Sequence, residues 1–157
     1  MSNIEDLKKL FSQFTSGINV IASINDMGDP EGFTANAFSS VSLKPPIILI
    51  CVDKTNENYD LFYKCKYFSV NILNKNQQNI SNIFASKSQR KFEGIPWKKE
   101  NLNVPILEGS IAWLECENYD QIIIGDHMVL FGKIKNYKIN KGSPLVYFRG
   151  NYVNITK

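Results

Sequence analysis

The sequence has no long hydrophobic run and almost no arginine. Its longest uninterrupted apolar stretch, Ile47 to Val52, holds six residues, whereas a membrane-spanning helix needs roughly 20. We therefore expect no membrane span. Sixteen of the 18 basic residues are lysines scattered along the chain. Because arginine supplies most bidentate contacts to bases and phosphates, nucleic acid is not an expected partner.

Cysteine and histidine are also scarce. Cys51, Cys65 and Cys116 show no pairing pattern, and no signal segment opens the chain, which is typical of the reducing cytoplasm. His127 is the one histidine, so a metal site would need dispersed ligands and none is expected. Two interpretations of Cys51 and Cys116 stay open. They are small buried hydrophobic residues, which the strand patterns favour, or one is a nucleophile paired with His127.

The composition indicates a folded chain with a substantial core. Of the 157 residues, 43% are hydrophobic and 12% aromatic, which is too apolar for a disordered protein. We expect one domain over residues 1–157.

Residue periodicity predicts a mainly β fold with two or three helices. Apolar residues at helical spacing predict helices over residues 1–14, 56–64 and 77–86. Residues 33–41 form a small, polar, partly extended segment, and residues 87–104 are expected to be a long loop. Strands are predicted at 18–24, 47–52, 67–73, 111–117, 122–124, 126–137, 145–148 and 152–155. Short strands with few helices are typical of a closed or nearly closed β-barrel.

The common nucleotide-binding and hydrolase motifs are missing, and one unusual segment remains. The run Gly32 to Leu43 interleaves small residues, hydroxyls and one amide. Small side chains let the backbone approach a flat ligand, and hydroxyl and amide groups can bond its polar rim. An ordinary Ser/Thr-rich edge strand is the alternative interpretation.

This segment, extended to Pro46 as GFTANAFSSVSLKPP, resembles the signature of the flavin reductase-like, FMN-binding split-barrel family. That family includes the small reductase components of two-component flavin monooxygenases. Six further similarities follow in the same order over nearly the whole chain. They lie at Phe14–Ile21, Phe68–Leu73, Gln78–Ala85, Arg90–Phe92, Gly125–His127 and Pro144–Tyr152.

The resemblance implies a fold, an assembly and an activity. It implies a six-stranded Greek-key split barrel that forms a homodimer, with flavin bound near the subunit interface. It further implies hydride transfer from NADH or NADPH to FMN or FAD. Reduced flavin would pass to a partner monooxygenase or to ferric iron. A non-enzymatic FMN-binding electron-transfer protein without a nicotinamide site is the alternative.

The resemblance also implies which residues bind flavin. Those expected along the isoalloxazine ring and ribityl chain are Thr34, Ala35, Asn36, Ser39, Ser40, Val41 and Ser42. Those expected at the other edge of the ring are Cys51, Val52 and Asp53.

The remaining expected site residues lie at the two ends of the ligand. Ser86, Arg90 and Lys91 would lie near the flavin phosphate, which carries close to two negative charges. Phe92 would cover the flavin or anchor its loop. His127 would act at the nicotinamide side, since its reference pKa lies near neutrality, and Asp126 would hold its tautomer or accept hydrogen bonds within the turn.

Overall fold

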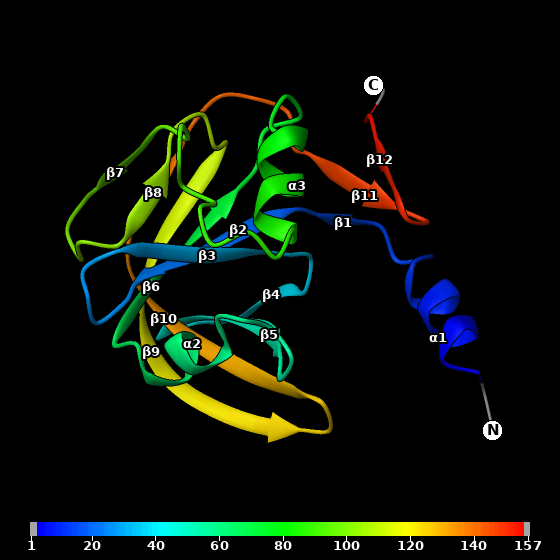
Figure 1. The fold of residues 1–157 in the computed structure, drawn as a ribbon, viewed down its shortest axis with the longest axis horizontal. Coiled ribbons are helices and arrows are strands. Elements are labelled where there is room, and N and C mark those ends of the chain that lie inside the picture. The colour runs from blue at the N-terminus through cyan, green and yellow to red at the C-terminus, as the bar shows by residue number, and fades with distance from the viewer. Residues whose placement is uncertain (1–2, 156–157) are drawn as a thin grey trace.

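The computed structural model describes residues 3–155 and is built mainly of β-strands (Figure 1). Within these residues there are three short helices: α1 (Ile4–Phe11), α2 (Tyr59–Lys64) and α3 (Gln78–Ala85). None of the described helices is long and apolar enough to cross a membrane. The predicted mainly β class is confirmed.

Seven strands form the central antiparallel sheet. Their order is β3 (Pro30–Ala35), β2 (Asn19–Ile24), β6 (Tyr67–Ile72), β9 (Ala112–Ile124), β10 (His127–Ile139), β5 (Pro46–Asp53) and β4 (Phe38–Leu43). The edge strands β3 and β4 are consecutive in the chain, and only Asn36 and Ala37 separate them. This short connection draws the two edges together, so the sheet curls into a barrel that stays split between β3 and β4. We expected six strands; the partly extended segment 33–41 instead divides at Asn36–Ala37 and contributes a strand to each edge.

Two smaller sheets flank the barrel. One joins β1 (Ser16–Gly17), β11 (Val146–Phe148) and β12 (Asn151–Val153). The other pairs β7 (Trp97–Lys99) with β8 (Pro105–Leu107). The prediction of a continuous loop over residues 87–104 is therefore wrong at β7. This strand has three residues and depends on a distant partner, so it carries little local signal.

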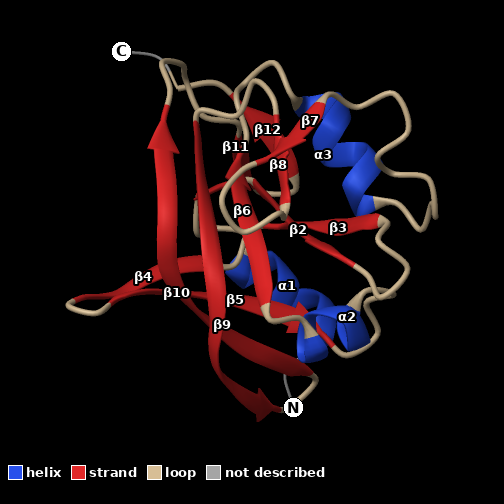
Figure 2. Ribbon diagram, turned by 90° about the vertical axis from the view of Figure 1, so that its left-hand side faces the viewer, coloured by secondary structure: helices blue, strands red, loops and turns tan. Residues whose placement is uncertain are grey.

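The strands β9 and β10 form the longest ribbon of the structure (Figure 2). The segments 111–117 and 122–124 were expected to be separate strands. From Ala112 onward they belong to the single strand β9, because pairing with β10 continues across the polar residues between them. The pairing shifts register between Phe131 and Gly132 and again between Ile134 and Asn136. Such bulges bend and twist a strand, which helps the long ribbon follow the barrel wall.

The core has two parts on opposite faces of β2. Ile21 belongs to the cluster inside the barrel, together with Phe62, Phe68 and Leu130. Val20 belongs to a second cluster that packs beneath α3. Because successive side chains of a strand point to opposite faces, β2 is buried on both sides, and Val20 to Ala22 at its centre are apolar without alternation.

Two expected helices begin or end differently from the prediction. Helix α1 starts after Asn3, whose side chain accepts a hydrogen bond from Glu5 N at 3.2 Å, and it ends at Phe11 rather than at residue 14. Helix α2 begins at Tyr59 rather than at Asn56. The side chain of Asn56 instead accepts a hydrogen bond from Asn58 N at 2.9 Å, which forms a turn before the helix.

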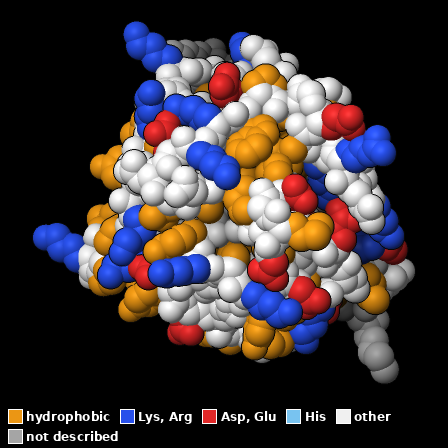
Figure 3. Space-filling view, turned by 60° about the vertical axis from the view of Figure 1, so that its left-hand side comes forward, with side chains coloured by type: hydrophobic (Ala, Val, Ile, Leu, Met, Phe, Trp, Pro, Cys, Tyr) orange, Lys and Arg blue, Asp and Glu red, His pale blue; other side chains and the backbone are white. Residues whose placement is uncertain are grey.

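The charged surface agrees with the scattered lysines of the sequence. On the face shown in Figure 3, Lys and Arg side chains are dispersed among acidic and apolar side chains.

Candidate functional site

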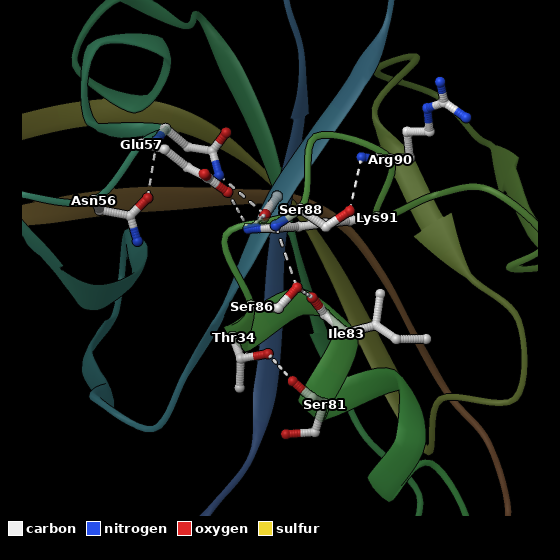
Figure 4. Close-up of polar contacts among 11 residues, drawn as sticks. Thr34, Asn56, Glu57, Ser81, Ile83, Ser86, Ser88, Arg90 and Lys91 are labelled. Atoms are coloured by element: carbon white, nitrogen blue, oxygen red, sulfur yellow. Dashed lines mark hydrogen bonds and ion pairs between the residues drawn. The ribbon is translucent and has the colours of Figure 1, made fainter.

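A cavity of about 450 Å³ lies beside the outer edge of β3. Its walls come from β3, from residues 55–57 after β5, from the end of α3 and from the loop that follows α3. Three of the expected flavin-binding residues line it: Thr34, Ser86 and Lys91. The cavity thus brings together residues from three separate parts of the chain (Figure 4).

The edge strand β3 turns the outer side of its backbone toward the segments that line this cavity and its neighbour. Gly32 O accepts hydrogen bonds from Asn58 Nδ2 at 3.0 Å and from Lys91 Nζ at 3.3 Å, so the outer side of the strand is polar. In an antiparallel strand the backbone groups of alternate residues face the same side, which places the N–H and C=O of Thr34 on that side too. The Thr34 hydroxyl donates to Ser81 O at 2.7 Å. The backbone of Thr34, rather than its hydroxyl, is therefore placed to meet a ligand.

The other expected ring-binding residues lie at the split and on the opposite edge. Ala35 is buried and Asn36 is exposed in the connection to β4. On β4, Ser39, Ser40 and Val41 are exposed and Ser42 is half-buried. None of these residues lines either of the two cavities found beside β3. Ser39, Ser40 and Val41 are thus exposed on the β4 side of the split, whereas Ala35 is buried at the end of β3.

The expected ring-edge residues of β5 face different environments. Val52 has no exposed surface and packs inside the barrel, so its side chain is unavailable to a ligand. Cys51 points the other way and is half-buried, and this burial raises the pKa of its thiol. Burial raises the pKa of Cys116 to about 12. Both thiols therefore stay protonated at neutral pH, which speaks against covalent Cys–His catalysis.

His127 begins β10 and lies opposite Asp53 of β5. Its Nδ1 is 2.7 Å from Asp126 Oδ1, and its side chain is 42% exposed. The hydrogen bond with His127 is the main cause of a lowered Asp126 pKa. Hydrogen bonds from Thr55 lower the pKa of Asp53, whose Oδ1 accepts from Thr55 N at 2.7 Å and from Thr55 Oγ1 at 2.8 Å. Thr55 lines the cavity and follows the Asp53 that pairs with His127. His127 therefore lies on the strand next to the segment that forms this part of the cavity wall.

The two cations expected at the phosphate differ sharply. The Lys91 side chain is 7% exposed, and its Nζ lies 2.5 Å from Glu57 Oε1. The Arg90 side chain is 81% exposed and points away from this pair (Figure 4), with Nη1 3.9 Å from Glu93 Oε2. Ser86 Oγ lies in the cavity wall and donates to Ile83 O at 2.7 Å. Lys91 therefore belongs to the cavity, whereas Arg90 faces the surface.

Phe92 anchors the loop that carries these cations. Its ring packs edge-on against Phe84 at 4.8 Å and Trp97 at 5.7 Å between centroids. Of the two roles expected for Phe92, the structure favours anchoring.

Sequence reasoning missed part of the cavity wall. Thr55, Asn56, Glu57 and Lys87 line it but were not expected at the site. The sequence does carry a signal for this part of the wall, because five polar residues, Lys54 to Asn58, directly follow a buried strand. Among residues 3–155, no three His, Cys, Asp or Glu side chains gather as a metal site would require.

Residues 11–156 match the family model described as the flavin reductase like domain. The chain belongs to this family. It is 38% identical over 157 residues to the reductase component of a flavin-dependent trigonelline monooxygenase from Acinetobacter baylyi, a match that covers all of this chain and 51% of the relative. It is 35% identical over 151 residues to the reductase subunit HsaB of a flavin-dependent monooxygenase from Mycobacterium tuberculosis, covering 94% of this chain and 80% of HsaB.

Solved structures agree with the family assignment. The chain matches the NADH:FAD oxidoreductase SgcE6 of Streptomyces globisporus, solved in complex with NAD and FAD fragments, with a TM-score of 0.92 and 27% identity. That match covers 99% of this chain and 96% of SgcE6. The predicted family and split-barrel fold are confirmed. The chain spans about half the length of two of the curated relatives that it matches.

Proposed function

We propose that this flavin reductase-like chain transfers hydride from NADH or NADPH to FMN or FAD and supplies reduced flavin to a partner monooxygenase. The observation that carries the proposal is the family match over residues 11–156. Two of the relatives are named as reductase parts of flavin-dependent monooxygenases, and SgcE6 is named as an NADH:FAD oxidoreductase. Ferric iron is a second possible acceptor of the electrons.

The residues around the split fit a flavin. A flat ring needs a wall without bulky side chains and a polar rim of hydrogen-bond donors and acceptors. The β3 edge at Gly32 and Thr34 has both properties, and the serines of β4 add hydroxyls across the split. At the other end of the cavity, Lys87 and Lys91 supply positive charge for a phosphate. Flavin itself supplies the hydride-accepting chemistry when it is bound.

We assign His127 to the nicotinamide side of this site. The lowered pKa keeps Asp126 ionised at neutral pH, and an ionised carboxylate only accepts hydrogen bonds. The proton of the shared bond therefore sits on His127 Nδ1, which leaves Nε2 to contact a ligand. In this arrangement Asp126 orients the ring and His127 hydrogen-bonds the nicotinamide or moves a proton beside the flavin.

We further propose that the chain works as a homodimer. Helix α1 has no buried residue and lies at one side of the molecule (Figure 1). Apolar side chains between 36% and 83% exposed follow one another on and after this helix: Ile4, Leu7, Leu10, Phe11 and Phe14. An apolar helix face of this size is typical of an interaction surface. A second copy of the chain is the occupant that the family resemblance favours.

Two further expectations stay proposals. We propose that residues 1–157 form a single domain and that the protein acts in the cytoplasm. The second proposal is supported by the thiols of Cys51, Cys65 and Cys116, which are all free.

Anaerobic reduction tests the activity. The purified protein is mixed with FMN or FAD, and the visible flavin band is followed after NADH or NADPH is added. Rapid bleaching with either nucleotide is expected, and the rates identify the preferred pair. Bound flavin that responds to neither nucleotide would favour the electron-transfer alternative. A protein that takes up neither flavin would refute both.

A further inference from the structure

An ion pair between buried Lys91 and exposed Glu57 separates two cavities beside β3. Lys91 and Glu57 both line the cavity described above and a neighbouring cavity of about 610 Å³. The second cavity lies between the β2–β3 turn and residues 88–93. The Lys91 ammonium is 2.5 Å from the Glu57 carboxylate, with side chains 7% and 39% exposed. The most deeply placed cation of the site is thus already neutralised by the protein.

This pairing changes what a phosphate experiences in the cavity. A flavin phosphate carries close to two negative charges, so Lys91 attracts it and Glu57 repels it. Both charges lie at nearly the same place, and burial reduces the screening of the Lys91 charge by solvent and salt. Their effects on a nearby phosphate therefore largely cancel. A flavin without phosphate is almost indifferent to the pair.

Glu57 is the acidic residue whose removal would release Lys91. Glu93 pairs with the exposed Arg90 at the surface, and the Asp53 carboxylate is bonded by Thr55. Asn58 Nδ2 donates to Gly32 O at 3.0 Å, so this corner of the cavity keeps a hydrogen bond to β3 without Glu57.

Building on the proposed function, we propose that Glu57 is a specificity-determining residue that lowers the affinity of the site for phosphate-bearing flavins relative to riboflavin. It does so by holding Lys91 in a neutral pair and by repelling the phosphate. FMN and FAD share the relevant chemistry, a phosphate next to the ribityl chain. The consequence is a flavin that exchanges readily.

A double-mutant cycle tests this role by equilibrium binding. Dissociation constants for FMN and riboflavin are measured by flavin fluorescence for the unmodified chain, Glu57→Gln, Lys91→Gln and the double variant, at one fixed salt concentration. Charge-assisted hydrogen bonds contribute enough for a roughly tenfold effect. Glu57→Gln is expected to raise the preference for FMN over riboflavin by about tenfold, and Lys91→Gln to lower it by about as much. The double variant should return to within about threefold of the unmodified chain, since it removes both charges.

Glu93→Gln is the matched control, because it removes an acidic charge paired with an exposed cation. It should change the preference less than about twofold, as expected of a surface pair. A preference that Glu57→Gln leaves unchanged or lowers would overturn the proposal. If Glu57→Gln fails to fold because it strands a buried cation, the other two variants decide. If Lys91→Gln lowers the preference for FMN over riboflavin and the double variant restores it, the proposal is supported. Any other result overturns it.

The proposed function fails separately. If the unmodified chain binds no flavin, or binds flavin that neither NADH nor NADPH reduces, the reductase assignment is wrong. If flavin binds and is reduced, but Glu57→Gln has the same preference for FMN over riboflavin as the unmodified chain, only the inference about Glu57 is wrong.

Discussion

Replacing His127 with alanine is expected to slow flavin reduction while flavin affinity and folding stability stay almost unchanged. The ring is 42% exposed, and its partner Asp126 lies at the surface. Exposed pairs of this kind contribute little to stability, so we expect the melting temperature to change by less than about 2 °C. His127 also does not line the cavity proposed to hold flavin, which is why flavin affinity should be preserved.

The size of the rate change separates the two roles open to His127. A single hydrogen bond to the nicotinamide is worth about 0.5–1.5 kcal/mol, which corresponds to a reduction rate slower by roughly 2- to 13-fold. Proton transfer by the imidazole would be worth more, about 10²- to 10⁴-fold. Asp126→Asn is the matched variant, because its amide oxygen still accepts the hydrogen bond from Nδ1 without the charge. We expect a smaller loss of rate from Asp126→Asn than from His127→Ala.

Anaerobic stopped-flow absorbance measures the reduction rate at saturating nucleotide, and a flavin titration measures the affinity. An unchanged rate in His127→Ala would refute the assignment and leave the residue a structural part of the β9–β10 turn. A loss of flavin affinity as large as the loss of rate would also refute it, because the effect would then arise in the flavin cavity.

Three further predictions concern the fold and the assembly. Gly132→Ala should lower the free energy of unfolding by about 1–3 kcal/mol in chemical denaturation, because the added Cβ would lie 2.5 Å from Phe68 Cζ. Gly17→Ala is the control and should leave the free energy of unfolding unchanged, because no atom lies within 4 Å of the added Cβ. Burial raises the Cys116 pKa in the folded state, so above pH 9 the unfolded chain loses the thiol proton first and stability should fall. Between pH 8 and 10 the free energy of unfolding of the unmodified chain should fall by about 1.4 kcal/mol more than that of Cys116→Ala. Phe11→Asp should convert a dimer to a monomer in light scattering without unfolding the barrel, and a dimer that persists would remove α1 from the interface.

Much of the barrel could be predicted because its strands carry local patterns. β5 and β6 are recognisable from apolar and β-branched residues between turn formers. β7 could not be predicted in this way. Its three residues include two exposed lysines, and what holds the segment is pairing with β8 and the contact of Trp97 with Phe92. Both contacts are made by the folded chain and leave no periodicity in the sequence.

The site shows the same division between local pattern and distant pairing. The family resemblance placed Thr34, Ser86 and Lys91 where the cavity forms. It could not predict that Glu57 neutralises Lys91, because the two residues are far apart in the sequence and meet only when the segment after β5 folds against the loop after α3. In the sequence, Asn56 stands before a helical pattern, and that local pattern does not indicate the role of the neighbouring Glu57 carboxylate.

Three polar side chains that line the cavity are already bonded within the protein, and this bears on how flavin is used. The Thr34 hydroxyl donates to Ser81 O, Ser86 Oγ donates to Ile83 O, and the Lys91 ammonium is paired with Glu57. A ligand that replaces such a bond gains only the difference between the new bond and the old one. Affinity must then come chiefly from the backbone edge of β3 and from apolar contact with the ring. A site built in this way favours a flavin that enters, is reduced and leaves, as the proposed supply of reduced flavin to a separate monooxygenase requires.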